Sequence, residues 1–145
     1  MSAWYEKYTG IPFKHLGDDN EGIDCYNLCR LVLKQECSLD IGKPSFHFCN
    51  IVDDDWYNKV TISPFEQAIK QELLCGSCRK VTIPAKFDII LMSIGATNVT
   101  NHCAIYAGNN KILQTMTQRD SWISSYGSYY KQYTTGIYRW INLNN

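Results

Sequence analysis

Residues Gly22-Ile-Asp-Cys-Tyr-Asn-Leu-Cys-Arg-Leu-Val-Leu-Lys34 predict a buried helix that begins at a cysteine. Small and apolar side chains recur at the spacing of one helix face: Cys25, Leu28, Cys29 and Val32. Asp24 is a favoured N-cap residue, so Cys25 is expected at the first helical position, beside backbone N–H groups that lack partners. The positive end of a helix lowers the pKa of a thiol and favours the nucleophilic thiolate. Cys25 is therefore a candidate nucleophile, and the alternative is a small buried side chain.

The composition is typical of one compact domain. The 145 residues are 45% hydrophobic, which is enough for a core. Fourteen basic and fourteen acidic residues cancel, so neither nucleic acid nor an anionic membrane is an expected partner. The first residues show no signal peptide, and no apolar run is long enough for membrane insertion, so we expect synthesis in the cytoplasm. The cysteine count of seven is odd and indicates reduced thiols rather than a disulfide framework.

Helices are expected in the first half of the chain. The helix that begins at Cys25 should end near Cys37. A second helix is expected to begin at a capping box, in which Ser63 is the N-cap, Pro64 occupies the first turn and Glu66 follows three residues after the serine.

The second half of the chain is rich in short β-type runs separated by turn residues. These runs predict strands at 87–93, 102–107, 111–115 and 136–141. A tight turn is expected at Gly108-Asn-Asn110, because glycine and asparagine accept the positive φ of hairpin turns. The sequence therefore predicts an α+β domain, with N-terminal helices and the Cys25 helix packed on a small, curled antiparallel sheet.

The sequence alone does not decide the structure or role of three segments. Residues 46–52 alternate weakly and are either strand or irregular, and Asp53-Asp-Asp55 lacks the pattern of a calcium loop and is expected to be a solvated acidic loop. Cys75-Gly-Ser-Cys78 has the spacing of a redox pair or of half a zinc site. The residues that would complete a zinc site lie far away in sequence: Cys37, His47 and Cys49. The sequence calls for no cofactor.

A nucleophilic cysteine needs a base, and His102 is the best placed of the three histidines. It opens the apolar run His102-Cys-Ala-Ile-Tyr-Ala107, so its ring can lie at the mouth of the sheet. Gln114 follows on the paired strand, where neighbours on one face are within side-chain reach. Its carbonyl is expected to accept the Nδ1–H of His102 and turn the other nitrogen toward the thiol. This arrangement has the logic of a catalytic triad with a neutral third member.

The other polar and thiol side chains near these positions are given structural roles. Asp24 is expected to be a helix cap and Asp88 a turn residue. Cys29 and Cys103 are expected in the core, and His15 in a solvated loop.

Four segments carry a family resemblance: Gly10-Ile-Pro-Phe-Lys-His-Leu-Gly17, Gly22-Ile-Asp-Cys-Tyr-Asn-Leu-Cys29, Pro84-Ala-Lys-Phe-Asp-Ile-Ile-Leu91 and Asn101-His-Cys-Ala-Ile-Tyr-Ala-Gly-Asn-Asn-Lys-Ile-Leu-Gln114. Taken in order, they resemble the NlpC-type family of papain-like cell-wall cysteine peptidases. The chain looks most like the branch found among bacteriophage tail-tip and tail-assembly proteins, including lambdoid tail proteins. The resemblance covers about residues 4–141 and implies a single papain-like domain over residues 1–145.

Members of that family cleave the peptide stems of peptidoglycan, typically between D-glutamate and the diamino acid. The resemblance implies Cys25 as nucleophile, His102 as general base and Gln114 as the orienting residue, with no metal or cofactor. It also implies stem peptides and other phage tail-tip proteins as partners, and a protein made in the host cytoplasm and carried in the virion tail tip. The alternative is a structural tail component whose peptidase site is vestigial or used only in assembly.

Three features depart from the family pattern. The third polar residue is more often histidine, so Gln114 orients the ring without supplying charge. Many members have tyrosine where Phe13 stands, which leaves a second oxyanion donor unidentified. The separation of 102 − 25 = 77 residues between the nucleophile and the base is long, so we expect a family-specific insertion at about 40–80 that shapes a groove or a contact.

Overall fold

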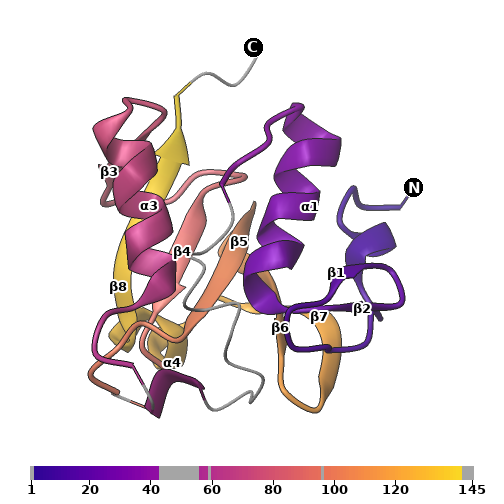
Figure 1. Ribbon diagram of the computed structural model, residues 1–145. Coiled ribbons are helices and arrows are strands. Elements are labelled where there is room, and N and C mark those ends of the chain that lie inside the picture. The colour runs from indigo at the N-terminus through magenta and orange to yellow at the C-terminus, as the bar shows by residue number, and fades with distance from the viewer. Residues whose placement is uncertain (1, 43–55, 59, 96, 142–145) are drawn as a thin grey trace.

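The computed structural model describes residues 2–42, 56–58, 60–95 and 97–141, and it has the predicted α+β architecture (Figure 1). The helical elements are η1 (Glu6–Tyr8), α1 (Cys25–Cys37), η2 (Trp56–Asn58), α3 (Pro64–Leu74) and α4 (Ser128–Gln132). The strands are β1 (Asp18–Asp19), β2 (Gly22–Ile23), β3 (Cys78–Val81), β4 (Ile89–Met92), β5 (His102–Gly108), β6 (Lys111–Met116), β7 (Arg119–Ser125) and β8 (Thr134–Trp140).

A six-stranded antiparallel sheet forms the centre of the domain, in the order β3-β8-β4-β5-β6-β7. The strands β1 and β2 form a separate small hairpin that leads into α1. The helices α1 and α3 lie against one face of the large sheet, where α1 contacts β5 and β6 and α3 contacts β3 (Figure 1). The nucleophile candidate therefore starts a helix that packs directly on the strand carrying the candidate base.

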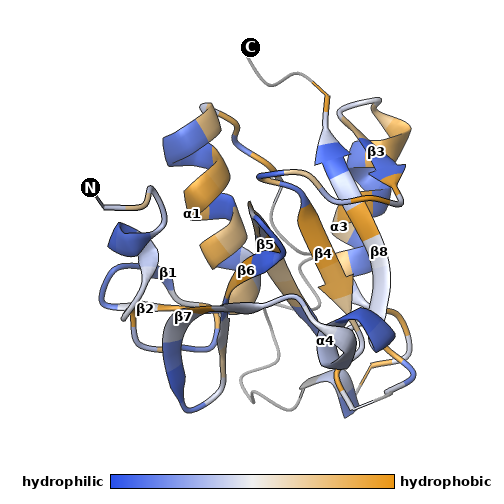
Figure 2. Ribbon diagram, turned by 180° about the vertical axis from the view of Figure 1, so that it is seen from behind, coloured by the Kyte–Doolittle hydropathy of each residue, from blue (hydrophilic) through white to orange (hydrophobic). Residues whose placement is uncertain are grey.

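Two apolar clusters cover the two faces of the sheet. The larger cluster lies between the sheet and the helices and includes Leu28 of α1, Phe65 of α3 and Leu91 of β4. The smaller cluster lies on the opposite face and includes Ile90 of β4 and Tyr126. Because successive side chains of a strand point to opposite faces, β4 is buried on both sides, and it is hydrophobic along its whole length (Figure 2).

The helix α1 has the predicted bounds, and its caps explain them. An Asp24 carboxylate oxygen accepts a hydrogen bond from the backbone N–H of Asn27 at 2.8 Å. At the other end, Ser38 has a φ of 56°, in the left-handed region, and its N–H bonds back to the last turn. The predicted cap role of Asp24 and the predicted start at Cys25 are both confirmed.

The second predicted helix is α3, and its predicted N-cap is confirmed. The Ser63 hydroxyl accepts from the N–H of Glu66 at 3.3 Å and donates to the carbonyl of Thr100 at 2.8 Å. The second bond ties the start of α3 to the loop that precedes β5. The cap therefore also helps to position the strand that carries His102.

Asp88 fixes the start of β4, as its predicted turn role requires. One carboxylate oxygen accepts from the N–H of Ala85 at 2.7 Å, and the pair of oxygens accepts from Arg139 of β8 at 2.9 and 2.8 Å. The Asp88 side chain is buried, whereas 27% of the Arg139 side chain is exposed. This fork-shaped ion pair joins two neighbouring strands and raises the pKa of Arg139.

The turn between β5 and β6 is also as predicted, since Asn109 and Asn110 have φ values of 52° and 61°. Several elements are absent from the sequence prediction: the strands β1, β2, β3 and β7 and the short helices η2 and α4. In β7, the run Arg119-Asp-Ser-Trp-Ile-Ser-Ser125 is largely polar because the strand closes an edge of the sheet. Edge strands of this kind carry a weak hydrophobic signal.

The open segments at 46–52 and 53–55, together with His47 and Cys49, lie outside the described residues. Cys75 is exposed at the end of α3, whereas Cys78 is buried in β3. Within the described ranges, no three histidine, cysteine or acidic side chains gather as a metal site would require. In those same ranges, no helix combines the length and apolar content needed to cross a membrane.

Candidate active site

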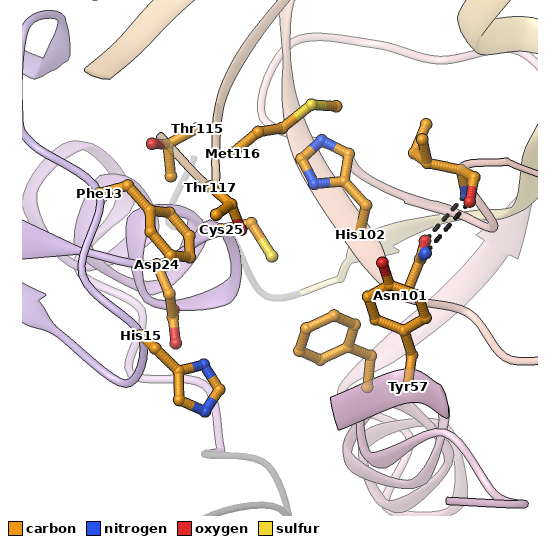
Figure 3. Close-up of a pocket in the computed structure, with 12 residues that line it drawn as sticks. Phe13, His15, Asp24, Cys25, Tyr57, Asn101, His102, Thr115, Met116 and Thr117 are labelled. Atoms are coloured by element: carbon orange, nitrogen blue, oxygen red, sulfur yellow. Dashed lines mark hydrogen bonds between the residues drawn. The ribbon is translucent and has the colours of Figure 1, made fainter. Parts of the chain in front are cut away.

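Cys25 opens onto a pocket of about 270 Å³ at the start of α1. The wall of this pocket is shared between Cys25 at the helix terminus, His102 at the first position of β5 and residues at the end of β6. Figure 3 shows the Cys25 sulfur and the His102 ring facing the same space. The structure thus brings the two predicted reacting groups to one cavity from elements 77 residues apart, which is 102 − 25.

The chain must fold tightly to deliver Cys25 to this position. The N–H of Asp24 donates to the carbonyl of Gly17 at 3.1 Å, and the second Asp24 carboxylate oxygen accepts from the N–H of Leu16 at 3.1 Å. A side chain at Gly17 would collide with the carbonyl of Gly22, so only glycine allows the two ends of this loop to approach. The loop and the helix cap therefore form one unit that holds the thiol.

His102 is fixed by a hydrogen bond to Gln114 on the neighbouring strand. The His102 Nε2 donates to Gln114 Oε1 at 2.8 Å, since an amide oxygen only accepts. The register pairs Ile105 with Leu113, which places His102 and Gln114 diagonally on one face of the sheet. Both side chains are buried.

The sequence predicts this contact through Nδ1 of His102, and that detail is wrong. The ring reaches diagonally from β5 to β6, and Nε2 is the nitrogen farther from the backbone, so Nε2 meets Gln114. The Nδ1 atom is left on the Cys25 side of the ring (Figure 3). With Nε2 carrying a proton, Nδ1 is the nitrogen free to exchange a proton with the thiol.

A further polar residue, Ser124 of β7, fixes the Gln114 amide. The Gln114 Nε2 donates to the Ser124 hydroxyl at 2.8 Å, which turns Oε1 of the same amide toward His102. Ser124 is not among the predicted site residues because its strand is not predicted. The largely polar run 119–125 lacks the apolar alternation that would have indicated a strand.

The pKa of the Cys25 thiol is lowered well below its ordinary value. The largest cause is a hydrogen bond with the thiol of Cys103, burial opposes it, and a hydrogen bond and the charge of His102 lower the pKa further. The N-terminus of α1 acts in the same direction. The surroundings of Cys25 thus act against burial, which by itself would raise the pKa of a thiol.

The pKa of the neighbouring Asp24 carboxyl is raised to about 7. Burial is the main cause and the charge of Cys25 adds to it, while the backbone hydrogen bonds from Asn27 and Leu16 oppose the shift. Burial and the charge of Cys25 thus disfavour the ionised form of the Asp24 carboxyl, although this carboxyl caps the helix.

Asn101 shapes the loop in front of His102. Its side-chain oxygen accepts from the N–H of Ile94 at 2.8 Å and its side-chain nitrogen donates to the carbonyl of Ile94 at 3.1 Å, as the dashed lines in Figure 3 mark. Both ends of the amide are engaged, so Asn101 closes the loop that forms one side of the pocket.

Aromatic side chains, among them those of Phe13, His15 and Tyr57, also line the pocket. His15, predicted to be solvated, lies half-buried in the wall instead, because the loop folds back over the start of α1. Phe13 also lines the wall, and its phenyl ring has no hydrogen-bond donor, as expected from the sequence. Tyr57, which the sequence analysis does not single out, brings a phenolic hydroxyl to the same wall.

These features define the class of protein: a papain-like α+β domain with a thiol at a helix N-terminus and an imidazole carried by the sheet. The chain belongs to the NlpC/P60 family, whose sequence profile matches residues 10–139. Comparison with curated proteins gives no match.

Solved structures share the fold. The NlpC/P60 domain of the peptidoglycan hydrolase SagA has a TM-score of 0.55 at 21% identity, over 90% of this chain and 88% of that one. The P60 domain of an antigen from M. avium subspecies paratuberculosis has a TM-score of 0.55 at 17% identity, over 96% and 89%. A lipoprotein-like NLP/P60 protein from Staphylococcus aureus has a TM-score of 0.61 at 15% identity, over 94% of this chain but only 38% of that one.

Proposed function

We propose that the chain is a thiol hydrolase that cleaves peptide stems of peptidoglycan, with Cys25 as nucleophile, His102 as general acid and base and Gln114 as orienting residue. The observation that carries the proposal is the meeting of Cys25 and His102 in one pocket, with His102 held by Gln114. Membership of the NlpC/P60 family supports the substrate class, because its members are generally cysteine peptidases that act on peptidoglycan.

The proposed reaction has two stages. The Cys25 thiolate attacks the amide carbonyl carbon, and His102 Nδ1 gives the leaving amine the proton that it took from the thiol. This leaves a thioester between the acyl group and Cys25. His102 then takes a proton from water, the resulting hydroxide attacks the thioester, and the released thiolate regains the starting state.

The start of α1 stabilises the negative oxygen that forms during attack. The N–H groups of Cys25 and Tyr26 belong to the first turn, where an α-helix has no internal acceptor for them, and the helix dipole points its positive end toward the pocket. Phe13 cannot contribute a donor. We assign the N–H of Cys25 as one donor of the oxyanion hole and Tyr57 as the candidate for the other.

Purified muropeptides provide the test of this activity. The wild-type protein should release stem-peptide fragments, and mass spectrometry of the products identifies the bond that is cut. Cys25→Ala should abolish release while leaving the circular dichroism spectrum unchanged. Cys75→Ala, which removes an exposed thiol outside the pocket, should retain full turnover. Turnover by Cys25→Ala equal to that of the wild type would refute the assignment.

We also propose that the domain acts in the tail tip of a bacteriophage, either during cell-wall entry or during tail assembly, after synthesis in the host cytoplasm. The support is the resemblance of the four ordered segments to that branch of the family. Antibodies against the domain should label one end of the tails of purified phage particles and precipitate other tail-tip proteins. Labelling confined to the host cell would contradict the location.

The competing function is a structural tail component with a vestigial site. The lowered pKa of Cys25 favours the enzyme, because an unused buried thiol has no need of a base and donors around it. Alkylation separates the two: Cys25 should react with iodoacetamide at neutral pH much faster than the exposed Cys75. Equal, slow labelling of both thiols would favour the structural role.

A further inference from the structure

The strand β7 has one extra residue close to the pocket. It pairs with β6 in regular register from Ser125 to Trp122, which lies opposite Gln114, but the next pair is Arg119 with Met116. The last two pairs are therefore three residues apart on β7 and two residues apart on β6. An insertion of this kind is a β-bulge, and it changes the face to which the side chains beyond it point.

The bulge brings Arg119 and Trp122 to one face of the sheet. Gln114 and Met116 share a face because they are two residues apart on β6, and each β7 side chain shares the face of the residue opposite it. In a regular strand, residues three apart would point to opposite faces. The guanidinium carbon of Arg119 accordingly lies 3.7 Å from the centre of the Trp122 ring, in a cation–π stack.

Hydrogen bonds on both sides hold the bulge in place. Ser121, inside the bulge, donates its N–H to the carbonyl of Ile11 at 2.9 Å and accepts at its own carbonyl from the N–H of Gly10 at 2.8 Å. On the other side, the Thr115 hydroxyl donates to the carbonyl of Arg119 at 3.0 Å. The backbone that carries Arg119 is therefore tied to both neighbouring segments of the chain.

The guanidinium of Arg119 has no acceptor among the described residues. In that part of the chain, no carboxylate pairs with it and no atom accepts a hydrogen bond from it. Arg30 and Arg139, by contrast, pair with Asp40 and Asp88. A guanidinium that stacks on an aromatic face keeps the donors in its own plane accessible, and its planar fork matches the two oxygens of a carboxylate.

Arg119 lies next to the wall of the pocket that contains Cys25 and His102. Its cross-strand partner Met116 lines this pocket together with His102 (Figure 3). Side chains directly opposite each other on two strands have Cβ atoms about 5 Å apart. The pocket wall itself, as far as the described residues form it, contains no lysine or arginine. Arg119 is therefore a cation placed one side chain away from the pocket.

We propose that Arg119 is a specificity-determining residue that binds a carboxylate of the substrate at the edge of the pocket. The inference rests on the proposed function for the identity of that substrate, a peptide stem whose D-glutamate and diamino acid carry carboxylates. Trp122 already orients the side chain, so a carboxylate gains two charge-assisted hydrogen bonds without first ordering the arginine. Arg119 contributes to binding and leaves the proton transfers at His102 unchanged.

Kinetics with paired synthetic stem peptides test the inference. One peptide has its free carboxylates, and in each of the others one carboxylate is replaced by a carboxamide. The wild type should cleave the free peptide with a kcat/KM about tenfold higher than that for one of the carboxamides. Arg119→Gln should remove this preference by raising KM for the free peptide about tenfold, with kcat unchanged. Arg119→Lys keeps the charge without the fork and should retain part of the preference.

Arg79→Gln is the matched control, because Arg79 is exposed on β3, the strand at the opposite edge of the sheet. It removes the same charge and should keep the preference of the wild type. A wild-type preference in Arg119→Gln would overturn the inference. An equal loss in Arg79→Gln would also overturn it, because the effect would then belong to the net charge of the protein.

Binding to Cys25→Ala separates this inference from the peptidase assignment. In calorimetric titrations, the free peptide should bind Cys25→Ala about tenfold more tightly than it binds the double variant Cys25→Ala/Arg119→Gln. This difference in binding without hydrolysis by the wild type would reject only the peptidase. Hydrolysis by the wild type without this difference would reject only the role of Arg119, and the absence of both binding and hydrolysis would reject both.

Discussion

The Nε2 atom of His102 donates to Oε1 of Gln114 at 2.8 Å, and this bond leaves Nδ1 as the nitrogen on the Cys25 side of the ring. The acceptor is a neutral amide, so it fixes the tautomer and the orientation of the ring without a charge to stabilise the imidazolium. The bond to Gln114 therefore fixes the direction in which the His102 ring points and adds no charge beside it.

Replacing Gln114 should slow the chemical step more than it weakens substrate binding. In Gln114→Ala the ring loses its hydrogen bond to the Gln114 amide and can rotate away from the thiol, and kcat should fall about 10- to 100-fold with little change in KM. Gln114→Glu keeps an acceptor and adds a charge that raises the pKa of the imidazole, so activity should persist with its pH profile displaced upward. Muropeptide kinetics across pH measure both effects, and a wild-type kcat in Gln114→Ala would remove Gln114 from the site.

Ser124→Ala tests whether the amide of Gln114 needs its own anchor. Loss of one hydrogen bond from Gln114 Nε2 should reduce kcat about two- to tenfold. Ser125→Ala is the matched control, because Ser125 is the exposed neighbour on the same strand. If both variants lose activity equally, the effect belongs to the strand and not to the hydrogen bond.

Asp24 should make the stability of the domain depend on pH. Its folded-state pKa of about 7 is above that of an unfolded aspartate, so its contribution is fully present below about pH 4 and is lost as pH rises through 7. Asp24→Asn removes this titration. The free energy of unfolding of the wild type should therefore fall relative to the variant between pH 4 and 8 in urea denaturation. Parallel curves over that range would show that the carboxyl is not perturbed.

The Asp88–Arg139 pair should matter for folding and not for chemistry. Asp88→Ala leaves Arg139 without its partner and removes the acceptor for Ala85, so the free energy of unfolding should fall by about 3 kcal/mol. The matched control is Asp40→Ala, whose exposed pair with Arg30 at 3.4 Å should contribute less than about 1 kcal/mol. Denaturant titration of the two variants compares them directly.

Much of the fold could be predicted because its signals are local. Asp24 and Ser63 mark their helix starts by their own hydrogen bonds to the backbone, and Asn109 and Asn110 mark their turn by the φ values that asparagine tolerates. The polar edge strand β7 could not be predicted in the same way, since its pairing with β6 and not its composition makes it a strand.

The site could be predicted only as far as sequence order and strand pairing allow. The contact of His102 with Gln114 follows from the hairpin, but the choice of nitrogen depends on the direction of the ring, which no spacing encodes. Ser124 could not be predicted for another reason. Its contact with Gln114 depends on which side chain it faces across the sheet.

The strand order has a consequence for how the chain is made. Thr134–Trp140 leaves the ribosome after every other strand, yet it lies between β3 and β4. Until that segment emerges, the wholly apolar β4 has an open edge that can pair with other chains, and nascent molecules are at risk of aggregation. A premature stop codon after Met92 and before Thr134 should therefore yield inclusion bodies rather than a smaller working domain.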